Sequence, residues 1–137
     1  MSDRVLRLVT AALTLATIGI AAYLVQAHYA EASVVCATGG CETVQQSRYS
    51  EIFGVPVALI GLLGSVAILL SLTRTDVLAR AAGLALTVCG LVFAVYLVAL
   101  QLVVLDAVCE WCVANDSLLV VIALLAALRA RHSAAGA

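Results

Sequence analysis

The sequence predicts an all-α membrane protein: a bundle of four transmembrane helices with a short surface helix after the first outward loop. Two observations predict this fold class, the composition and four long runs that carry almost no charge. Hydrophobic residues make up 65% of the 137 residues and charged residues only 11%, whereas soluble domains have about 45–50% apolar residues. A soluble domain this small could not bury so much apolar surface, so the bilayer must take the place of a core. The length fits a single domain over residues 1–137.

The four apolar runs supply the spans, which we place at about residues 6–28, 54–73, 79–105 and 111–129. About 20 helical residues cross a hydrocarbon core of about 30 Å, so the first three runs are long enough. The fourth run contains Asp116. A carboxylate near a helix centre costs about 2.5–3.5 kcal/mol on the insertion scale and less near an end. Because Asp116 lies near the start of its run, we expect this run to span as well.

The distribution of arginine orients the four helices. In this arrangement Arg48 lies on one side of the membrane and the other six arginines lie on the opposite side. The positive-inside rule makes the six-arginine side cytoplasmic, with both termini there. We therefore expect a multi-pass protein of the cell inner or plasma membrane. A cleaved signal peptide ending near Ala27 is the competing interpretation, but the first apolar run exceeds the roughly 7–15 residues of a signal core.

Between the first two spans lies the largest polar segment, residues 30–51. Gly39 and Gly40 can relax the restrictions on φ and close a tight loop there. Residues 42–50 are expected to form the short helix on the membrane surface. Pro56 then opens the second span, near its first turn, where the missing N–H of proline costs least.

Glycines recur inside the predicted spans. Gly61 and Gly64 share a face of the second span, and Gly83 and Gly90 lie about two turns apart in the third. In lipid, helices associate through close backbone approach at small residues. We therefore expect these glycines to pack the bundle.

Four of the five cysteines form two close pairs, Cys36/Cys41 and Cys109/Cys112, each in a polar break between apolar runs. The breaks follow the first and third runs, so both pairs lie on the outer side, where disulfides form and persist. Cys109-Glu110-Trp111-Cys112 is a C-x-x-C motif at the start of a helix, and the positive end of the helix dipole stabilises a thiolate there. Two dithiols on one face predict thiol–disulfide exchange.

Exchange proceeds by thiolate attack, so electrons pass between pairs that touch. The exposed loop pair would take electrons from a soluble partner and pass them to Cys109 and Cys112 at the membrane boundary. An acceptor in the bilayer is then needed, and a quinone is the candidate. Asp116 lies one turn after Cys112 on the same face and could deliver a proton. Cys89 lies in the middle of a span, where a free cysteine is expected to pack as a small hydrophobic residue.

Two other interpretations compete with exchange chemistry. The four cysteines could hold a structural zinc ion, although such sites are mostly intracellular. The pairs could instead be static disulfides that brace a non-enzymatic membrane protein. A C-x-x-C disulfide closes too small a loop to stabilise a fold much through chain entropy. A redox role is therefore favoured, with no metal and no nucleic acid as ligands.

The pattern as a whole resembles the vitamin K epoxide reductase family, specifically its small bacterial members without a fused thioredoxin-like domain. The resemblance runs from about Ala30 to Leu128 and rests on the two cysteine pairs, Ser47, Tyr49-Ser50 and Phe53-Gly54-Val55-Pro56.

The resemblance implies a four-helix bundle that encloses a quinone, either menaquinone or ubiquinone. Cys112 would face the quinone ring, Cys109 would exchange with the loop pair, and Ser47 would help to line the pocket. Because Asp116 shares a helix face with Cys112, we expect it to contact the quinone together with Ser47.

Two departures from the family bear on the substrate. Vertebrate members carry an Asn in the second helix and a Tyr one turn after the second C-x-x-C cysteine. Here residues 56–72 contain no Asn, and the latter position is Asp116. This favours quinone reduction coupled to disulfide formation over vitamin K epoxide reduction, with a separate thioredoxin-fold disulfide oxidant as the partner on the outer side. Disulfide bond formation protein B, another four-helix quinone reductase, has its C-x-x-C in the first outward loop, whereas here that motif comes second.

Overall fold

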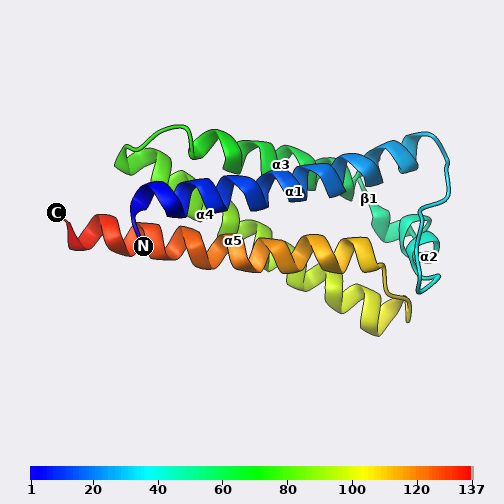
Figure 1. The fold of residues 1–137 in the computed structure, drawn as a ribbon. Helices are drawn as coiled ribbons and strands as arrows, with labels where there is room; N and C mark the ends of the chain where they lie inside the picture. Colours follow the sequence, from blue (N-terminus) through cyan, green and yellow to red (C-terminus); the bar gives the residue numbers. More distant parts are fainter. Residues whose placement is uncertain (137) are drawn as a thin grey trace.

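A computed structural model describes residues 1–136, which form a bundle of four long helices (Figure 1). Residues 41–56 form a small structure at one end of the bundle, which we call the cap. Helix α1 packs against α3 and α5, and α4 packs against the same two helices. Both termini and the α3–α4 connection lie at the end opposite the cap (Figure 1). The long helices are α1 (Asp3–Tyr29), α3 (Val57–Ser71), α4 (Val77–Ala99) and α5 (Glu110–Ala135).

Within residues 1–136, three helices are long and apolar enough to cross a membrane: Asp3–Tyr29, Val77–Val104 and Glu110–Ala135. The second of these is α4 together with the π-helix η2 (Leu100–Val104) that continues it. Helix α3 has 15 residues, and at about 1.5 Å per residue it is shorter than a hydrocarbon core of about 30 Å. The predicted second span, 54–73, is therefore helical only over 57–71.

The start of each membrane-length helix has a side-chain cap. Ser2 accepts a hydrogen bond from the backbone N–H of Val5 at 3.3 Å and begins α1. Asp76 accepts from Ala79 at 3.2 Å and begins α4. Such caps satisfy N–H groups that have no partner inside the helix. The third cap, at α5, is a cysteine of the site described below.

The cap region differs from the single surface helix predicted over 42–50. It consists of α2 (Cys41–Gln45), a 3₁₀ turn η1 (Arg48–Ser50) and a two-stranded hairpin. Ser47 is extended, with φ −69° and ψ 156°, and its hydroxyl donates to the Val44 carbonyl at 2.7 Å. A serine that bonds the local backbone in this way competes with helix propagation. The helix therefore ends before Ser47 and begins one residue earlier than predicted.

The hairpin pairs β1 (Glu51–Ile52) with β2 (Val55–Pro56) across a tight turn. Phe53 and Gly54 form the turn with φ of 52° and 79°. Pro56 belongs to β2 and is the N-cap of α3. Pro56 therefore lies next to the first turn of α3, as predicted.

The predicted packing of glycines holds in the third span and fails in the second. A Cβ added to Gly83 would lie 2.6 Å from Ser71 Oγ, and one added to Gly90 would lie 3.1 Å from a Leu119 methyl carbon. These are close helix–helix contacts. A Cβ added to Gly61 or Gly64 would meet nothing within 4 Å, because both glycines line a cavity.

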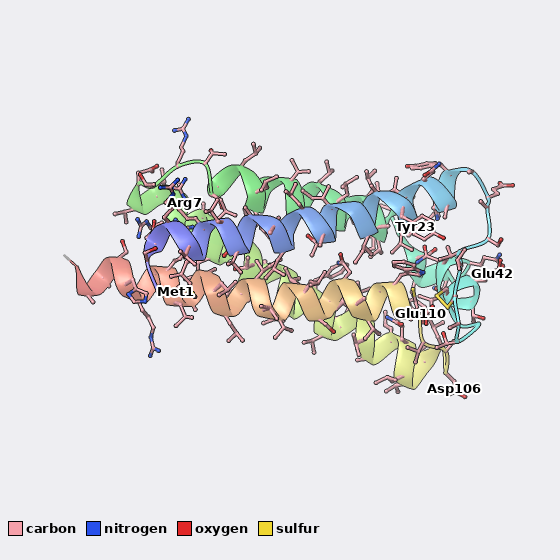
Figure 2. All side chains as sticks on the ribbon, in the orientation of Figure 1. Met1, Arg7, Tyr23, Glu42, Asp106 and Glu110 are labelled. Carbon is pink, nitrogen blue, oxygen red and sulfur yellow. A yellow bond between two sulfur atoms is a disulfide. The ribbon has the colours of Figure 1, made fainter. Side chains whose placement is uncertain are left out.

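The two ends of the bundle differ in their charged residues. Arg7 lies at the end that holds Met1, whereas Glu42, Asp106 and Glu110 lie at the cap end (Figure 2). At the terminal end, Asp3 accepts from Arg129 Nε at 3.2 Å and lies 3.6 Å from an Arg80 nitrogen. This cluster joins the first turn of α1 to the start of α4 and the end of α5.

Candidate functional site

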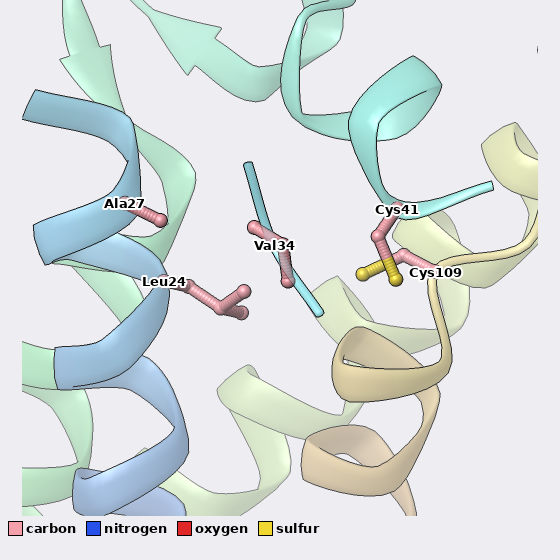
Figure 3. Packing of buried hydrophobic residues seen from close by; sticks show 5 residues of the cluster. All are labelled: Leu24, Ala27, Val34, Cys41 and Cys109. Carbon is pink, nitrogen blue, oxygen red and sulfur yellow. The ribbon is translucent and has the colours of Figure 1, made fainter. Parts of the chain in front are cut away.

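The structure brings the two cysteine pairs together at the cap end. Cys36 and Cys41 form a disulfide, whereas Cys109 and Cys112 are free thiols. Cys41 and Cys109 are both fully buried and belong to one apolar cluster (Figure 3). The loop pair and the C-x-x-C pair therefore meet through Cys41 and Cys109.

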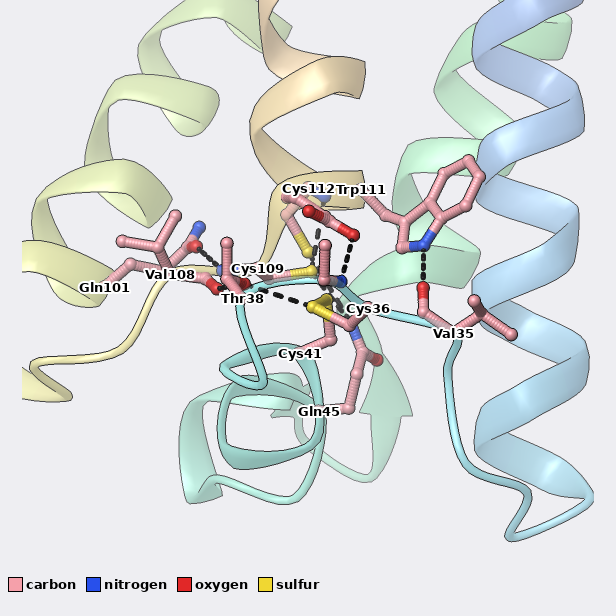
Figure 4. The surroundings of a disulfide bond; sticks show 12 residues. Val35, Cys36, Thr38, Cys41, Gln45, Gln101, Val108, Cys109, Trp111 and Cys112 are labelled. Atoms are coloured by element: carbon pink, nitrogen blue, oxygen red, sulfur yellow. Dashed lines mark hydrogen bonds between the residues drawn. A yellow bond between two sulfur atoms is a disulfide. The ribbon is translucent and has the colours of Figure 1, made fainter.

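The loop that carries the disulfide is held against the start of α5. The backbone N–H of Ala37 donates to Glu110 Oε1 at 2.7 Å, and the Thr38 hydroxyl donates to the Val108 carbonyl at 3.1 Å (Figure 4). A carboxylate oxygen of Glu110 also lies within 4.8 Å of both loop sulfurs. These contacts seat the disulfide on the C-x-x-C segment.

An aromatic pair completes the attachment of this loop to the bundle. The indole N–H of Trp111 donates to the Val35 carbonyl, and the N–H of Val35 donates to the Tyr23 hydroxyl at 3.0 Å. The rings of Tyr23 and Trp111 meet edge to face, with centroids 5.3 Å apart. Helix α1, the loop and α5 are thus tied together beside the cysteines.

Two glycines allow the loop to approach so closely, as the sequence predicted for a tight turn. Gly39 has a φ of +74°, which L side chains rarely adopt. Gly40 has an ordinary φ but lies against the backbone of Val108, where an added Cβ would overlap the carbonyl oxygen. A side chain at residue 40 would push the loop away from α5.

Cys109 is the N-cap of α5, as predicted for a C-x-x-C at a helix start. Its Sγ accepts from the backbone N–H of Cys112 at 3.3 Å, and its own N–H donates to Gln101 Oε1 at 2.8 Å. A hydrogen bond from the Cys112 thiol lowers the pKa of Cys109 to about 7; burial opposes this shift, while the Cys112 N–H and Gln45 add to it. Cys109 is therefore poised to ionise near neutral pH.

A cavity of about 340 Å³ opens inside the bundle below the cysteines. Cys112, Ser47 and Asp116 line it, while Cys109 lies outside the lining. Cys89, which was expected to pack in the interior, is exposed and lines the same cavity. Most of the remaining lining is apolar, including Ala21, Leu24, Val57, Ile60, Ile68, Phe93, Leu97 and Leu119.

Polar atoms without partners lie in this apolar lining. Asp116 Oδ2 and Asn115 Oδ1 are buried, and neither has a hydrogen-bond partner within residues 1–136. Buried polar atoms are nearly always paired, so these two oxygens indicate where a polar group of a ligand would be satisfied. Both residues follow Cys112 on α5.

Sequence reasoning missed two glutamines. Gln45 Nε2 lies 3.6 Å from Cys112 Sγ and 4.0 Å from Cys109 Sγ, and Gln101 caps the Cys109 N–H. Gln45 comes four residues after Cys41 and so shares its helix face. Gln101 is a polar residue within a long apolar run, which marks a functional candidate at membrane depth. Both signals were available in the sequence.

Comparison with known families agrees with this geometry. The profile of the vitamin K epoxide reductase family matches residues 8–128, a region that contains all four paired cysteines. No curated protein matches the chain. The match covers most of the sequence and indicates an oxidoreductase that works in a membrane. The chain belongs to the vitamin K epoxide reductase family.

Proposed function

We propose that the chain is a quinone-dependent thiol oxidoreductase that supports disulfide bond formation. Electrons would enter from a dithiol on the extracytoplasmic side and pass through Cys36/Cys41 and Cys109/Cys112 to a membrane quinone. One observation carries the proposal: the C-x-x-C pair touches the loop pair through Cys109 and borders the cavity through Cys112.

Two exchange steps connect the pairs. When Cys109–Cys112 is a disulfide and the loop pair is reduced, the Cys41 thiolate attacks Cys109 Sγ. A Cys41–Cys109 bond forms, and Cys112 leaves as a thiolate. The Cys36 thiolate then attacks Cys41 Sγ, the loop disulfide forms, and Cys109 leaves as a thiolate. The product has an oxidised loop pair and two free thiols, which is the arrangement described above.

A soluble partner would reach this relay at Cys36. This cysteine is partly exposed, whereas Cys41 is fully buried. A partner thiolate would attack Cys36 Sγ and form a mixed disulfide, and Cys41 would leave as a thiolate. The second thiolate of the partner would then attack the partner's own sulfur in that bond, so that the partner becomes oxidised and Cys36 leaves as the thiolate that serves the next cycle. A separate thioredoxin-fold disulfide oxidant has the exposed dithiol that this step requires.

The cavity suits a quinone, either menaquinone or ubiquinone. Its walls are mostly apolar, and a few polar side chains, including Gln45, Asn115 and Asp116, lie near Cys112, as is typical of small-molecule sites. When bound, a quinone accepts the two electrons and two protons that the thiols give up. Asp116 holds an unpartnered buried oxygen at this point and would supply a proton, and Asn115 and Ser47 would orient the ring.

The same proposal includes four membrane crossings with both termini in the cytoplasm. Helix α3 contains no charged residue, and the adjoining residues of the uncharged run 52–73 lengthen the segment beyond the helix. Arg7 lies at the terminal end with Arg80 and Arg129, whereas Glu42, Asp106 and Glu110 lie at the cap (Figure 2). This asymmetry follows the positive-inside rule when the cap faces outward.

Replacing single residues tests the relay. Cys112→Ala removes the sulfur beside the cavity and should abolish dithiol-driven quinone reduction by purified protein. Ser117→Ala changes an exposed residue outside the cavity lining and should retain turnover. Cys36→Ser blocks the second exchange step and should accumulate a Cys41–Cys109 disulfide, detectable by mass spectrometry of non-reduced peptides. Full turnover in Cys112→Ala would leave the chain as a membrane protein with structural disulfides. Quinone reduction without any need for Cys36 and Cys41 would indicate an enzyme acting mainly on the quinone.

A further inference from the structure

Gln45 contacts both sulfurs of the C-x-x-C pair. It lies on α2, one turn after Cys41, and its side chain lines the cavity. The amide nitrogen Nε2 lies 3.6 Å from Cys112 Sγ and 4.0 Å from Cys109 Sγ (Figure 4). An amide nitrogen has two N–H donors and no acceptor, so it can only donate to the sulfurs.

The two sulfurs depend on Gln45 to different degrees. Cys109 Sγ also accepts from the backbone N–H of Cys112 at 3.3 Å. Apart from the neighbouring thiol, Cys112 Sγ has no hydrogen-bond donor other than Gln45 within residues 1–136. A thiolate at Cys112 would therefore be stabilised mainly by this one amide. Hydrogen bonds to charged groups contribute about twice as much as neutral ones.

We propose that Gln45 is a catalytic residue, whose amide N–H groups stabilise the thiolate that leaves in each of the two exchange steps. This inference rests on the proposed function. In the first step, the Cys109–Cys112 bond breaks and its electron pair stays on Cys112 Sγ. In the second step, the Cys41–Cys109 bond breaks and the electron pair stays on Cys109 Sγ. Gln45 contacts both of these leaving sulfurs.

The position of Gln45 also links the two pairs mechanically. Cys41 and Gln45 lie on the same face of a five-residue helix. When Cys41 moves to bond Cys109, Gln45 moves with it. The donor is therefore delivered to the C-x-x-C together with the attacking thiolate.

A test compares the reactivity of the thiols in variants of residue 45 and of its neighbour. Gln45→Leu keeps a similar volume and removes both donors, and Gln45→Glu keeps the shape and places an acceptor at the sulfurs. Gln46→Leu is the matched control, because Gln46 is the next residue and is exposed. Each full-length protein is purified, reduced and alkylated with iodoacetamide over a range of pH, and mass spectrometry quantifies the label on each cysteine.

Since the thiolate is the reacting form, Gln45→Leu should slow alkylation of Cys109 and Cys112 at neutral pH by about tenfold, from the strength of a hydrogen bond to a charged group. Gln45→Glu should slow it further, and Gln46→Leu should match the wild type.

Unchanged alkylation in the Gln45→Glu protein would overturn the assignment even where the leucine variant does not fold. An equal loss in Gln46→Leu would also overturn it. Alkylation needs no quinone, so slowed alkylation supports the role of Gln45 even in a protein that fails to reduce quinone.

Discussion

Cys109 shows how one residue is prepared for exchange. Its pKa is lowered from 9.0 to about 7, chiefly by the Cys112 thiol, against the opposing effect of burial. The thiolate is the nucleophile, so alkylation of Cys109 should reach half its maximal rate near pH 7 and fall at lower pH. Cys112→Ala removes the main donor and should move the midpoint toward pH 9. Alkylation kinetics followed by mass spectrometry measure both midpoints, and identical midpoints would contradict the hydrogen-bond account.

Asp116 offers a second prediction for a single residue. The other titratable side chains that line the cavity are Tyr49, Cys89 and Cys112, so Asp116 is the one carboxyl group among the described lining residues. General acid catalysis contributes about 10²–10⁴-fold. Asp116→Asn should therefore slow quinone reduction by about 10²-fold or more and remove one limb of the pH–rate profile, while Cys109–Cys112 still forms a disulfide.

The control for Asp116 is its neighbour on α5. Ser117 is exposed, and its hydroxyl donates to the Val113 carbonyl at 2.7 Å, so Ser117→Ala should leave the pH–rate profile unchanged. A wild-type profile in Asp116→Asn would mean that another group supplies the proton.

Among the elements, the disulfide loop depends on its close fit against α5. Gly40→Ala would place a Cβ against the Val108 carbonyl, so the loop must shift and Cys41 must move away from Cys109. We expect slower formation of the Cys41–Cys109 disulfide in a Cys36→Ser background, measured by quenched alkylation. Gly19→Ala is the control, because its added Cβ meets nothing within 4 Å. Equal rates of disulfide formation in the two variants would show that exchange does not depend on the close contact between Gly40 and Val108.

The long helices could be predicted from the sequence, and the cap could not. Runs of apolar residues determine where a chain leaves water, so α1, α4 and α5 lie close to their predicted ranges. The structure of the cap depends on local hydrogen bonds, which a hydropathy pattern does not show. The Ser47 hydroxyl donates to the Val44 carbonyl, and Val55 and Pro56 form strand β2 instead of the start of the second span. The start of α3 therefore lies later than predicted.

The site was predictable only in part for a related reason. The order of the apolar runs alone places both cysteine pairs at the same end of the bundle. The helical repeat places Asp116 one turn after Cys112 on the same face of α5. The contacts of Gln45 and Gln101 depend on the short α2 and on the π-helical end of α4, neither of which leaves a periodic signal. The sequence therefore identifies the reacting sulfurs and marks both glutamines as polar candidates, but it does not show that Gln45 contacts the sulfurs or that Gln101 accepts from the Cys109 N–H.

For the whole molecule, the direction of the bundle in the membrane is the main prediction. The arginine end should lie in the cytoplasm and the cap outside. After reduction, a membrane-impermeant thiol reagent added to intact cells should label Cys36, which is partly exposed. A protein carrying Cys36→Ser and otherwise unchanged should lose most of this label. Labelling that occurs only in inverted membrane vesicles would reverse the orientation.

The π-helix at the end of α4 limits how the length of this chain can vary in evolution. The N–H of Leu105 donates to the Leu100 carbonyl and that of Ala107 to the Gln101 carbonyl, so this turn holds more residues than an α-helical turn. Deleting one residue after Gln101 would return the segment to α-helical phase and rotate everything beyond it by about 100° relative to Gln101. The Cys109 N–H would then lose its acceptor. Insertions and deletions should therefore be tolerated in the exposed connection 73–75, at the opposite end of the bundle, and be selected against between Gln101 and Cys109.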